Sequence, residues 1–558
     1  MTHTVPETSL SQRLPLLVLP LVALIAILPL LVNGCSCGHD FDFHILSWME
    51  AATQFLHGSL HPHWAFTPAF NAGEPRFVFY PPISWSIGAV LGLLMPWSIT
   101  PIAYTWLSLT AAGLALHYLV RDFAPPSIAL LLATLYIVNP YILFTAYERT
   151  AYAELLAAAW LPLLLHAVLR DKVTIPRIAI PIALLWLTNA PAAVMGCYAL
   201  ALLAALRLVM TPRNADPSRT APLQLALNSV AGTALGLGLA AFYILPAAYE
   251  RRYVQIAMAI VEGMRIEDNF LFHHTPDPDH DGVLRTASLI AVGLLLFTAT
   301  ALLTAIVRAR RAPRNYKLLQ TLYALAALTA VIAFLQMPLS IALWHHAPEL
   351  RFLQFPWRFL AVLVPVLAFT ISIILKRPLR NRWLYPGLVL SASLTFIWYP
   401  IFRQSCDPED TVAARLALYH SPTGTDPTDE YTPNTADNDA LGKTNPPYWL
   451  ADSPDDPPPA NLPAGSLHWP LDIASPEPQT LILILNLRNY PAWRITLNHE
   501  QVAERLPRTD GLIAIPIPAG TSHLEVSYIR APDETIGWGI SIASLAVLGF
   551  TLRRHPSY

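Results

Sequence analysis

The stretch LPLLVLPLVALIAILPLLV, at residues 14–32, contains no charged or strongly polar side chain. A helix needs about 20 mainly apolar residues to cross the hydrocarbon core of a bilayer, so this stretch predicts a membrane-spanning helix. Across the whole chain of 558 residues, 54% are hydrophobic and only 13% are charged. This composition excludes an ordinary soluble protein and makes the lipid bilayer the first expected partner.

Similar apolar runs recur along the chain, and each predicts another helix. They lie near 101–120, 126–144, 151–169, 224–245, 286–307, 316–337, 358–376, 383–401 and 536–552. Residues 175–209 predict a hairpin of two short helices, broken at Asn189-Ala190-Pro191 because proline removes a backbone donor. The run 83–95 is short for a full crossing and predicts a re-entrant or interfacial helix. The expected fold class is an all-α polytopic membrane bundle of about 12–13 spans.

Basic residues mark one end of the apolar runs, in clusters that start at Arg170, Arg207, Arg308, Lys376 and Arg553. Because cytoplasmic loops carry an excess of Lys and Arg, these clusters predict cytoplasmic N- and C-termini. The segments expected on the outer face are then 34–80, 246–285, 338–357 and 402–535. A net charge of −2 gives no reason to expect a nucleic-acid partner.

Residues 402–470 are rich in Pro, Asp, Asn and Thr, which favours turns and predicts an exposed, irregular outside segment. Four short runs with β-branched content then predict strands at 480–487, 493–498, 511–518 and 523–529. The expected organisation is a transmembrane domain over 1–401, the irregular segment over 402–470, a small outward-facing β-sandwich-like domain over 471–535, and a final helix with a basic tail over 536–558. The chain has four cysteines, which makes a disulfide framework unlikely.

Two carboxylates, Asp40 and Asp42, follow the first apolar run and are flanked by His39 and His44. Acidic groups at the mouth of a span can bind a divalent cation such as Mg²⁺ or Mn²⁺, or act as a general base toward a hydroxyl. They can equally serve only to solvate the end of the helix. The residues that follow, 45–57, predict an amphipathic helix along the membrane surface.

Two further points on the expected outer face carry charged residues beside an apolar run. Glu148, Arg149 and Glu154 lie at the start of a span, where they either reach water or meet an anionic group such as phosphate. Arg351 and Arg358 flank the aromatic stretch FLQFPW, where an arginine either pairs with neighbouring helices or binds an anionic head group. Loosely spaced His57, His61 and His63, and the acidic stretch at 273–282, are more typical of solvated loops than of metal sites.

The layout as a whole resembles the GT-C class of membrane glycosyltransferases, with YfhO-like bacterial proteins closest in layout. The resemblance rests on the acidic first loop, on FYPPISW at 79–85, on ERTAYAELLAAAWLPLLL at 148–165 and on the late segments NYPAWRITLN and IPAGTSHLEVSYI. It implies location in a bacterial inner membrane and transfer of a sugar, on the outer face, from a polyprenyl-phosphate donor to a glycan, lipid or protein acceptor of the cell envelope.

The same resemblance implies roles for particular side chains. Asp40 or Asp42 would be the catalytic general base or the ligand to a divalent ion. Arg149, Arg351 and Arg358 would bind the departing phosphate, where negative charge develops. His44, Glu148 and Glu154 would support them.

Two other function classes fit parts of the sequence. A non-catalytic transporter or flippase for lipid-linked glycans would need polar residues threading the bundle, and these are sparse in the predicted spans. An assembly factor would bind partners through 402–535. The acids of the first loop discriminate between these classes, because only the enzyme depends on them.

Overall fold

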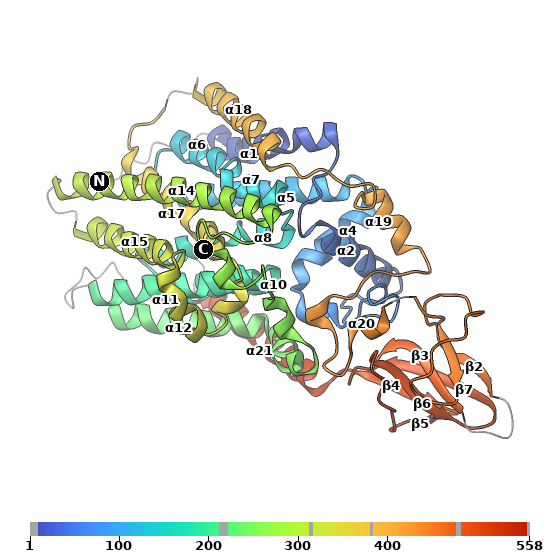
Figure 1. Ribbon diagram of the computed structural model, residues 1–558. Helices are drawn as coiled ribbons and strands as arrows, with labels where there is room; N and C mark the ends of the chain where they lie inside the picture. Colours follow the sequence, from blue (N-terminus) through green and yellow to red (C-terminus); the bar gives the residue numbers. More distant parts are fainter. Residues whose placement is uncertain are drawn as a thin grey trace.

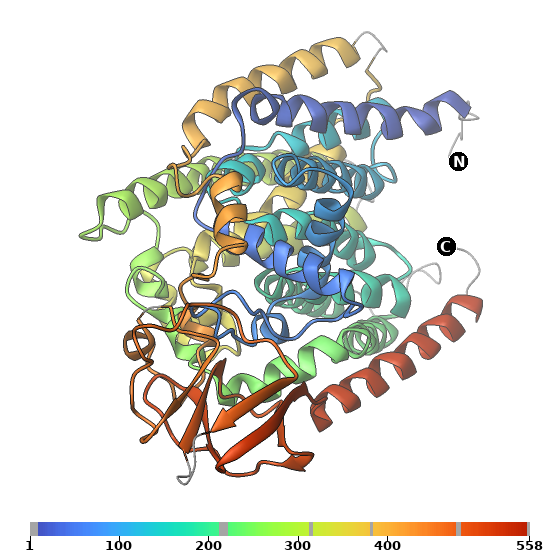
Figure 2. The same cartoon turned by 90° about the vertical axis from the view of Figure 1, so that its right-hand side faces the viewer.

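The computed structural model describes residues 9–210, 221–311, 316–379, 383–442, 444–475 and 481–554. Long helices lie side by side in a bundle, and a small β-rich domain lies at one end of the molecule (Figure 1). In the perpendicular view, α1 (Ser9–Asn33) and α21 (Pro532–Arg554) lie on different edges of the bundle (Figure 2). The described chain is therefore a helical bundle with one β-rich domain before the last helix, as the sequence predicts.

The remaining α-helices are α2 (Phe41–Leu56), α3 (Arg76–Phe79), α4 (Pro82–Leu94), α5 (Thr100–Val120), α6 (Pro126–Ile137), α7 (Pro140–Tyr147), α8 (Tyr152–Ala157), α9 (Trp160–Leu169), α10 (Ile175–Thr188), α11 (Ala190–Met210), α12 (Pro222–Leu239), α13 (Ala241–Glu250), α14 (Pro278–Arg311), α15 (Tyr316–Leu335), α16 (Ile341–His346), α17 (Leu360–Ile374), α18 (Leu384–Phe402), α19 (Val412–Tyr419) and α20 (Asn438–Leu441). Short 3₁₀-helices are η1 (Arg251–Tyr253), η2 (Ile256–Ile260), η3 (Ile266–Asn269), η4 (Pro338–Ser340), η5 (Leu350–Leu353), η6 (Pro356–Phe359) and η8 (Asp429–Tyr431).

Within the described residues, nine helices are long and apolar enough to cross a membrane, and the pair α12 and α13, bent by 76°, gives a tenth if it is one span. The chain is thus a multi-pass membrane protein. The predicted count of about 12–13 spans is higher than this because it also includes α5 and α10. Helix α10 has only 14 residues, which is too short for a full crossing. The predicted break at Asn189 is confirmed, because α10 ends at Thr188 and Asn189 has an extended backbone.

Small residues let helices approach closely inside the bundle. A Cβ added at Gly232 or Gly236 of α12 would lie only 2.8 Å or 2.7 Å from the side chain of Ile178 or Ile182 on α10. Glycines four residues apart on one helix face allow such backbone contact between membrane helices. The two helices α10 and α12 therefore pack closely along this face.

Helix α2 is more deeply buried than the predicted surface helix. Its apolar face packs on α4, where Gly88 lies against the ring of Trp48. Its polar face is also covered, because Glu50 is only 3% exposed and accepts a 2.5 Å hydrogen bond from the Thr67 backbone N–H. The polar face expected to be exposed is therefore covered, because the loop at 64–76 packs over the side that the sequence leaves polar; the place of this helix along the membrane surface stays a prediction.

The β-rich domain has two antiparallel sheets, with strand orders β1-β3-β6 and β2-β7-β4-β5. The strands are β1 (Tyr448–Ala451), β2 (Leu471–Ser475), β3 (Leu481–Arg488), β4 (Trp493–Leu497), β5 (Glu500–Gln501), β6 (Leu512–Ile517) and β7 (Gly520–Tyr528). The four predicted strands correspond to β3, β4, β6 and β7, with residue 480 outside the described residues. Leu483, Ile495 and Ile515 are fully buried in the core between the sheets.

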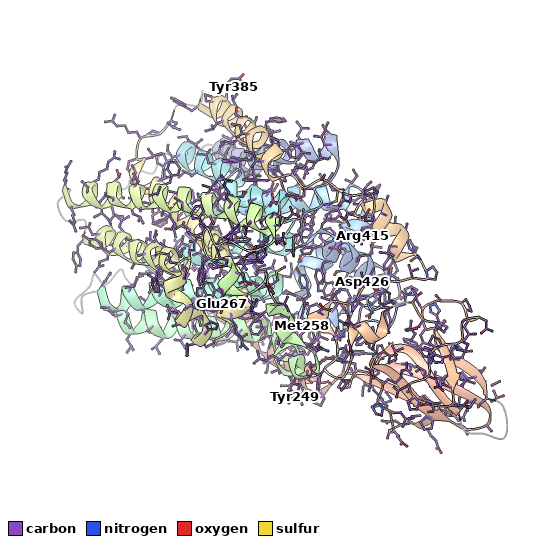
Figure 3. The ribbon with its side chains drawn as sticks, viewed as in Figure 1. Tyr249, Met258, Glu267, Tyr385, Arg415 and Asp426 are labelled. Atoms are coloured by element: carbon purple, nitrogen blue, oxygen red, sulfur yellow. A yellow bond between two sulfur atoms is a disulfide. The ribbon has the colours of Figure 1, made fainter. Side chains whose placement is uncertain are left out.

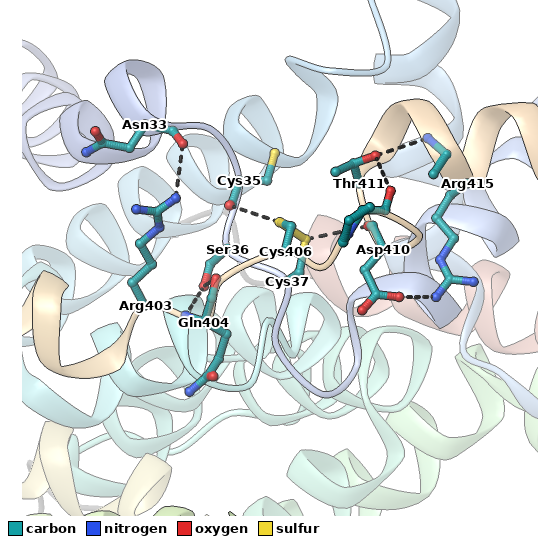
Figure 4. The surroundings of a disulfide bond; sticks show 12 residues. Asn33, Cys35, Ser36, Cys37, Arg403, Gln404, Cys406, Asp410, Thr411 and Arg415 are labelled. Atoms are coloured by element: carbon teal, nitrogen blue, oxygen red, sulfur yellow. Dashed lines mark hydrogen bonds and ion pairs between the residues drawn. A yellow bond between two sulfur atoms is a disulfide. The ribbon is translucent and has the colours of Figure 1, made fainter.

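A disulfide between Cys37 and Cys406 joins the first loop to the start of the 402–470 segment (Figure 4). The low cysteine count gives no sign of this bond, which links positions 369 residues apart. Backbone contacts accompany it, since Gln404 N–H donates to the Ser36 hydroxyl at 2.9 Å and Cys37 N–H donates to Gln404 at 3.3 Å. The first loop and the 402–470 segment therefore form one unit.

Replacing Cys37 and Cys406 together by serine is expected to lower the free energy of unfolding by about 2–4 kcal/mol, because the closed loop is long. Hydrogen exchange in residues 402–431 should also become faster. Detergent-induced unfolding and exchange mass spectrometry measure the two effects. Cys197→Ser, at a free cysteine on α11, is the matched control. Unchanged exchange in 402–431 would contradict the linking role.

Candidate active site at the mouth of the bundle

A cavity of about 1300 Å³ opens where the first loop meets the bundle. Its lining comes from the loop and α2, from the α7–α8 and α10–α11 breaks, from α13, η2, η5 and η6, and from 415–444. Arg415 and Asp426 mark this last segment on the side nearer the β-rich domain, and Met258 of η2 lies on the bundle side (Figure 3). Segments far apart in the sequence therefore converge on one open cavity.

The break between α7 and α8 brings the first loop close to charged residues. Thr150 has a left-handed backbone, with φ of 47°, which ends α7 and turns the chain before α8. Asp40 N–H donates to the Arg149 carbonyl at 3.0 Å. Gly38 is required at this approach, since a Cβ there would lie 2.1 Å from the Glu148 carbonyl oxygen. The backbone itself thus fixes Asp40 beside Arg149.

Arg149, Glu154 and Arg358 form one buried cluster. Arg149 Nη1 donates to Glu154 Oε2 at 2.7 Å, and Arg358 Nε lies 3.4 Å from the same oxygen. The Tyr141 hydroxyl donates to the other carboxylate oxygen, Oε1, at 2.6 Å. Two guanidinium groups share one carboxylate, so the cluster keeps a net positive charge that can attract an anion.

Aromatic rings support the two arginines. The guanidinium of Arg149 lies 4.9 Å from the centre of the Trp357 ring, and that of Arg358 lies 4.8 Å from the centre of the Phe355 ring. Cation–π contacts of this kind hold a cation in place without neutralising it. The sequence points to Arg149 and Arg358 but not to the role of these rings, which the aromatic residues around Arg358 signal only weakly.

Asp40 is the first-loop carboxylate that meets this cluster. Its Oδ2 lies 3.8 Å from Arg149 Nη2, and its Oδ1 lies 3.0 Å from His39 Nδ1. Burial by itself would raise the pKa of Asp40, but the hydrogen bond from His39 and the charge of Arg149 outweigh it and hold the pKa below its usual range. Asp40 is therefore ionised at neutral pH, while a third of its side chain stays accessible.

Asp42 lines the same cavity but is more exposed than Asp40 and lies next to a different arginine. Its side chain is 47% exposed, and its nearest cation is Arg415 Nη2 at 3.8 Å, on the 402–470 segment. Its Oδ1 accepts a 2.7 Å hydrogen bond from the Phe43 backbone N–H at the start of α2. The structure thus separates the two predicted acids, with Asp40 beside the arginine cluster and Asp42 beside the outer segment.

His44 lines the cavity as a buried neutral imidazole. It is 1% exposed, its ring contacts Tyr80 and Tyr152, and its Nδ1 atom has no hydrogen-bond partner among the described residues. Burial lowers the pKa of His44 to about 4. A buried nitrogen without a partner is costly, so Nδ1 is open to a hydrogen bond with water or with a bound molecule.

Between pH 7 and pH 4, wild type is expected to lose about 3 kcal/mol more stability than His44→Gln. The reason is that the folded-state pKa lies below the ordinary value of 6.5, so the unfolded chain takes up the proton first and stability falls as the pH falls through this window. The free energy of unfolding of wild type and of His44→Gln, measured in one detergent at steps of pH, gives the two curves to be compared. Parallel curves would contradict the burial of an uncharged His44.

Two predicted residues lie apart from the cluster. Arg351 is not among the described residues that line the cavity, and its guanidinium instead lies 4.9 Å from the Phe352 ring. Glu148 is bonded to Gln404 Nε2 on the outer segment, and burial raises its pKa to about 7. Arg351 and Glu148 are thus the two predicted site residues that do not line the cavity. The cavity is lined by the other six: Asp40, Asp42, His44, Arg149, Glu154 and Arg358.

Metal-ligand groups do not assemble in the described part of the chain, where no three His, Cys, Asp or Glu side chains converge. His63 Nε2 lies 3.2 Å from Glu534 at the base of α21, in a contact between the first loop and the last helix. The first-loop acids offer two carboxylates, each with a cationic neighbour. This donor set forms no all-protein cage, although Mg²⁺ also binds through one or two carboxylates plus substrate phosphates.

No family model matches this chain, and no curated protein matches it. Among solved structures, it is similar to the arabinofuranosyltransferase AftD from mycobacteria, with 13% identity and a TM-score of 0.39 over 71% of this chain and 27% of that chain. It is also similar to the apo oligosaccharyltransferase of Archaeoglobus fulgidus, with 15% identity and a TM-score of 0.38 over 75% of this chain and 57% of that chain. The chain thus spans less than two thirds of either protein.

Proposed function

We propose that this protein is a membrane glycosyltransferase that moves a sugar from a polyprenyl-phosphate donor to a cell-envelope acceptor on the outer face of a bacterial inner membrane. The observation that carries the proposal is the shared cavity, in which the ionised Asp40 lies 3.8 Å from Arg149, one of two buried arginines that share the carboxylate of Glu154. A base and an anion site side by side are what a transfer from a phosphate-linked sugar requires.

The donor has an apolar surface available in the same cavity. Its bundle side is lined by Trp186 and Val194 around the α10–α11 break, by Ile244 and Ala248 of α13, and by Met258 of η2. A polyprenyl chain can bury its isoprene units against such residues, while its phosphate meets Arg149 and Arg358. This arrangement supports a lipid-linked rather than a nucleotide-linked sugar.

In the proposed reaction, an acceptor hydroxyl attacks the anomeric carbon and forms the new glycosidic bond. The bond from that carbon to the phosphate oxygen breaks, and its electron pair leaves with the polyprenyl phosphate. Asp40 accepts the proton of the attacking hydroxyl as the new bond forms. Arg149 and Arg358 stabilise the charge that grows on the phosphate, and Glu154 holds both guanidinium groups in position. A divalent ion, if bound, would be held by Asp40 or Asp42 and would neutralise phosphate charge; no step above depends on it.

A transporter or flippase is the alternative that the cavity does not favour. Asp40, Arg149 and Arg358 cluster at one end of the bundle, at the mouth next to the outer segment, and do not form a polar path across it. The assembly factor remains an alternative use of 402–535, but it gives no reason for an ionised carboxylate beside buried arginines.

The test is transfer of radiolabelled sugar by the purified protein in vesicles, with a panel of polyprenyl-phosphate hexoses and pentoses. Release of polyprenyl phosphate, with the label in a new glycoside or in free sugar, is the expected result for at least one donor. Arg358→Met, which keeps an unbranched apolar stem and removes the charge, should lower this rate by about 10²-fold or more. Full rate in a folded Arg358→Met variant would overturn the assignment of the phosphate site.

A further inference from the structure

One wall of the cavity comes from the 402–470 segment and is chemically unlike the arginine cluster. Residues 423–431, which we call the outer wall, contribute to the lining at every position from Thr423 to Tyr431. Asp426, Asp429 and Glu430 carry its charge, and none of them has an ion-pair partner within the described ranges. Asp429 accepts a 2.7 Å hydrogen bond from Asn438 Nδ2, which leaves Asp426 and Glu430 as the two acids of the wall without such a bond. The wall therefore presents carboxylates that are open to a ligand.

The outer wall is held rigidly against the first loop. Thr425 N–H donates to the Thr67 carbonyl at 3.0 Å, and Thr428 N–H donates to Glu74 Oε2 at 2.9 Å. Gly424 has a left-handed φ of 70°, and a Cβ at this position would lie 2.5 Å from the Asn71 nitrogen. A preformed surface of this kind binds a ligand without first having to be ordered.

Aromatic rings lie next to these carboxylates. The Tyr431 ring stacks on Phe79 at 5.6 Å, and Phe43 lies 5.0 Å from Tyr80 and 6.5 Å from Tyr431. All four rings line the cavity. Flat aromatic faces pack against the C–H face of a sugar ring, while carboxylates accept hydrogen bonds from its hydroxyl groups.

The charge of the whole cavity limits what this wall can bind. Seven lining residues are acidic and five are arginines: Asp40, Asp42, Glu154, Glu349, Asp426, Asp429 and Glu430 against Arg76, Arg149, Arg251, Arg358 and Arg415. Three of these arginines already pair with carboxylates outside the cluster, Arg76 with Glu74, Arg251 with Glu349 and Arg415 with Asp410. An acceptor with many negative charges would be repelled at the outer wall.

We infer that the outer wall is the acceptor subsite and that the acceptor is an uncharged, hydroxyl-rich glycan chain. This inference rests on the proposed glycosyltransferase function and narrows its acceptor from a glycan, lipid or protein to a neutral glycan. Asp426 and Glu430 accept hydrogen bonds from the sugar hydroxyls, and the Phe79–Tyr431 stack supports the ring. The unpartnered Nδ1 of His44, buried in the same cavity, is a further group for the bound acceptor to satisfy.

The test measures glycan binding to the full-length protein in detergent with no donor present, so it does not depend on transfer. The probes are neutral oligosaccharides of about six residues (malto-, manno- and arabino-oligosaccharides) and oligogalacturonates of the same length as the anionic counterpart. Binding is measured by saturation-transfer NMR and calorimetry at pH 8, because burial raises the pKa of Glu430 to about 6 and it is then ionised.

At least one neutral oligosaccharide is expected to bind wild type, and the double variant Asp426→Asn with Glu430→Gln should weaken that binding at least 10-fold. The matched control is Glu409→Gln with Asp455→Asn, which makes the same charge change at exposed positions of the same segment away from the cavity and should bind as wild type does. Preferential binding of oligogalacturonate, equal binding by the double variant, or no binding of any neutral probe would each overturn the inference. Each of these results leaves the transfer assay free to succeed, so failure here is distinct from failure of the proposed function.

Discussion

Replacing Asp40 with asparagine is expected to lower the rate of sugar transfer by about 10²- to 10⁴-fold, the usual contribution of a general base. Asparagine has the same shape and cannot accept the proton of the acceptor hydroxyl. The change should reduce kcat with little effect on the KM for the donor, because the arginine cluster that binds the phosphate is retained. Initial rates in vesicles with saturating donor measure it.

Asp42→Asn is the matched control for this variant. It makes the same substitution two residues away, at a side chain that is 47% exposed and lies beside Arg415 rather than beside Arg149. We expect its rate to remain within about 10-fold of wild type. If Asp42→Asn lost activity and Asp40→Asn kept it, with both proteins folded, the base would be Asp42 and the role assigned to Asp40 would be wrong.

Replacing Glu154 with glutamine is expected to destabilise the protein by about 3–5 kcal/mol, the usual cost of removing one partner from a buried ion pair. Glu154 is 4% exposed, and both Arg149 and Arg358 depend on it. Without its charge, two buried guanidinium groups face each other with only the partly exposed Asp40 nearby. The free energy of unfolding in mixed detergent micelles measures this loss.

Glu148→Gln is the control for Glu154→Gln. Glu148 lies in the same break between α7 and α8, but its pKa of about 7 means that about half of the molecules already carry a neutral side chain at neutral pH. Its loss of stability should stay below about 1 kcal/mol. Similar values for the two variants would show that Glu154 does not hold the arginines together as described.

The sequence was sufficient to predict the elements that depend on local patterns. Apolar runs gave the helices, Asn189-Ala190-Pro191 gave the α10–α11 break, and alternating β-branched residues gave four of the seven strands. Each of these signals lies within a window of about 20 residues, where periodicity is informative. Asp40 and Arg149 stood out for a similar local reason, since charges next to an apolar run are rare.

The rest depended on contacts between distant segments. Glu50 belongs to the amphipathic helix predicted over 45–57 and lies on its polar side. Only the loop at 64–76 explains why this side chain is buried. The pairing of Cys37 with Cys406 and the convergence of Arg358 on Glu154 join positions hundreds of residues apart. The outer wall looked like an irregular loop because Pro, Asp and Thr favour turns, and nothing in that composition signals that it lines a cavity.

The proposed reaction requires a prenyl phosphate to bind in the cavity with its phosphate at Arg149 and Arg358. Photo-crosslinking tests this binding, with a prenyl-phosphate probe that carries a diazirine on its first isoprene unit and mass spectrometry to locate the label. We expect labelling at the α10–α11 break, on α13 and in η2, competed by unlabelled prenyl phosphate and reduced in Arg358→Met. Labelling confined to lipid-facing helices such as α18 and α21, without competition, would contradict it.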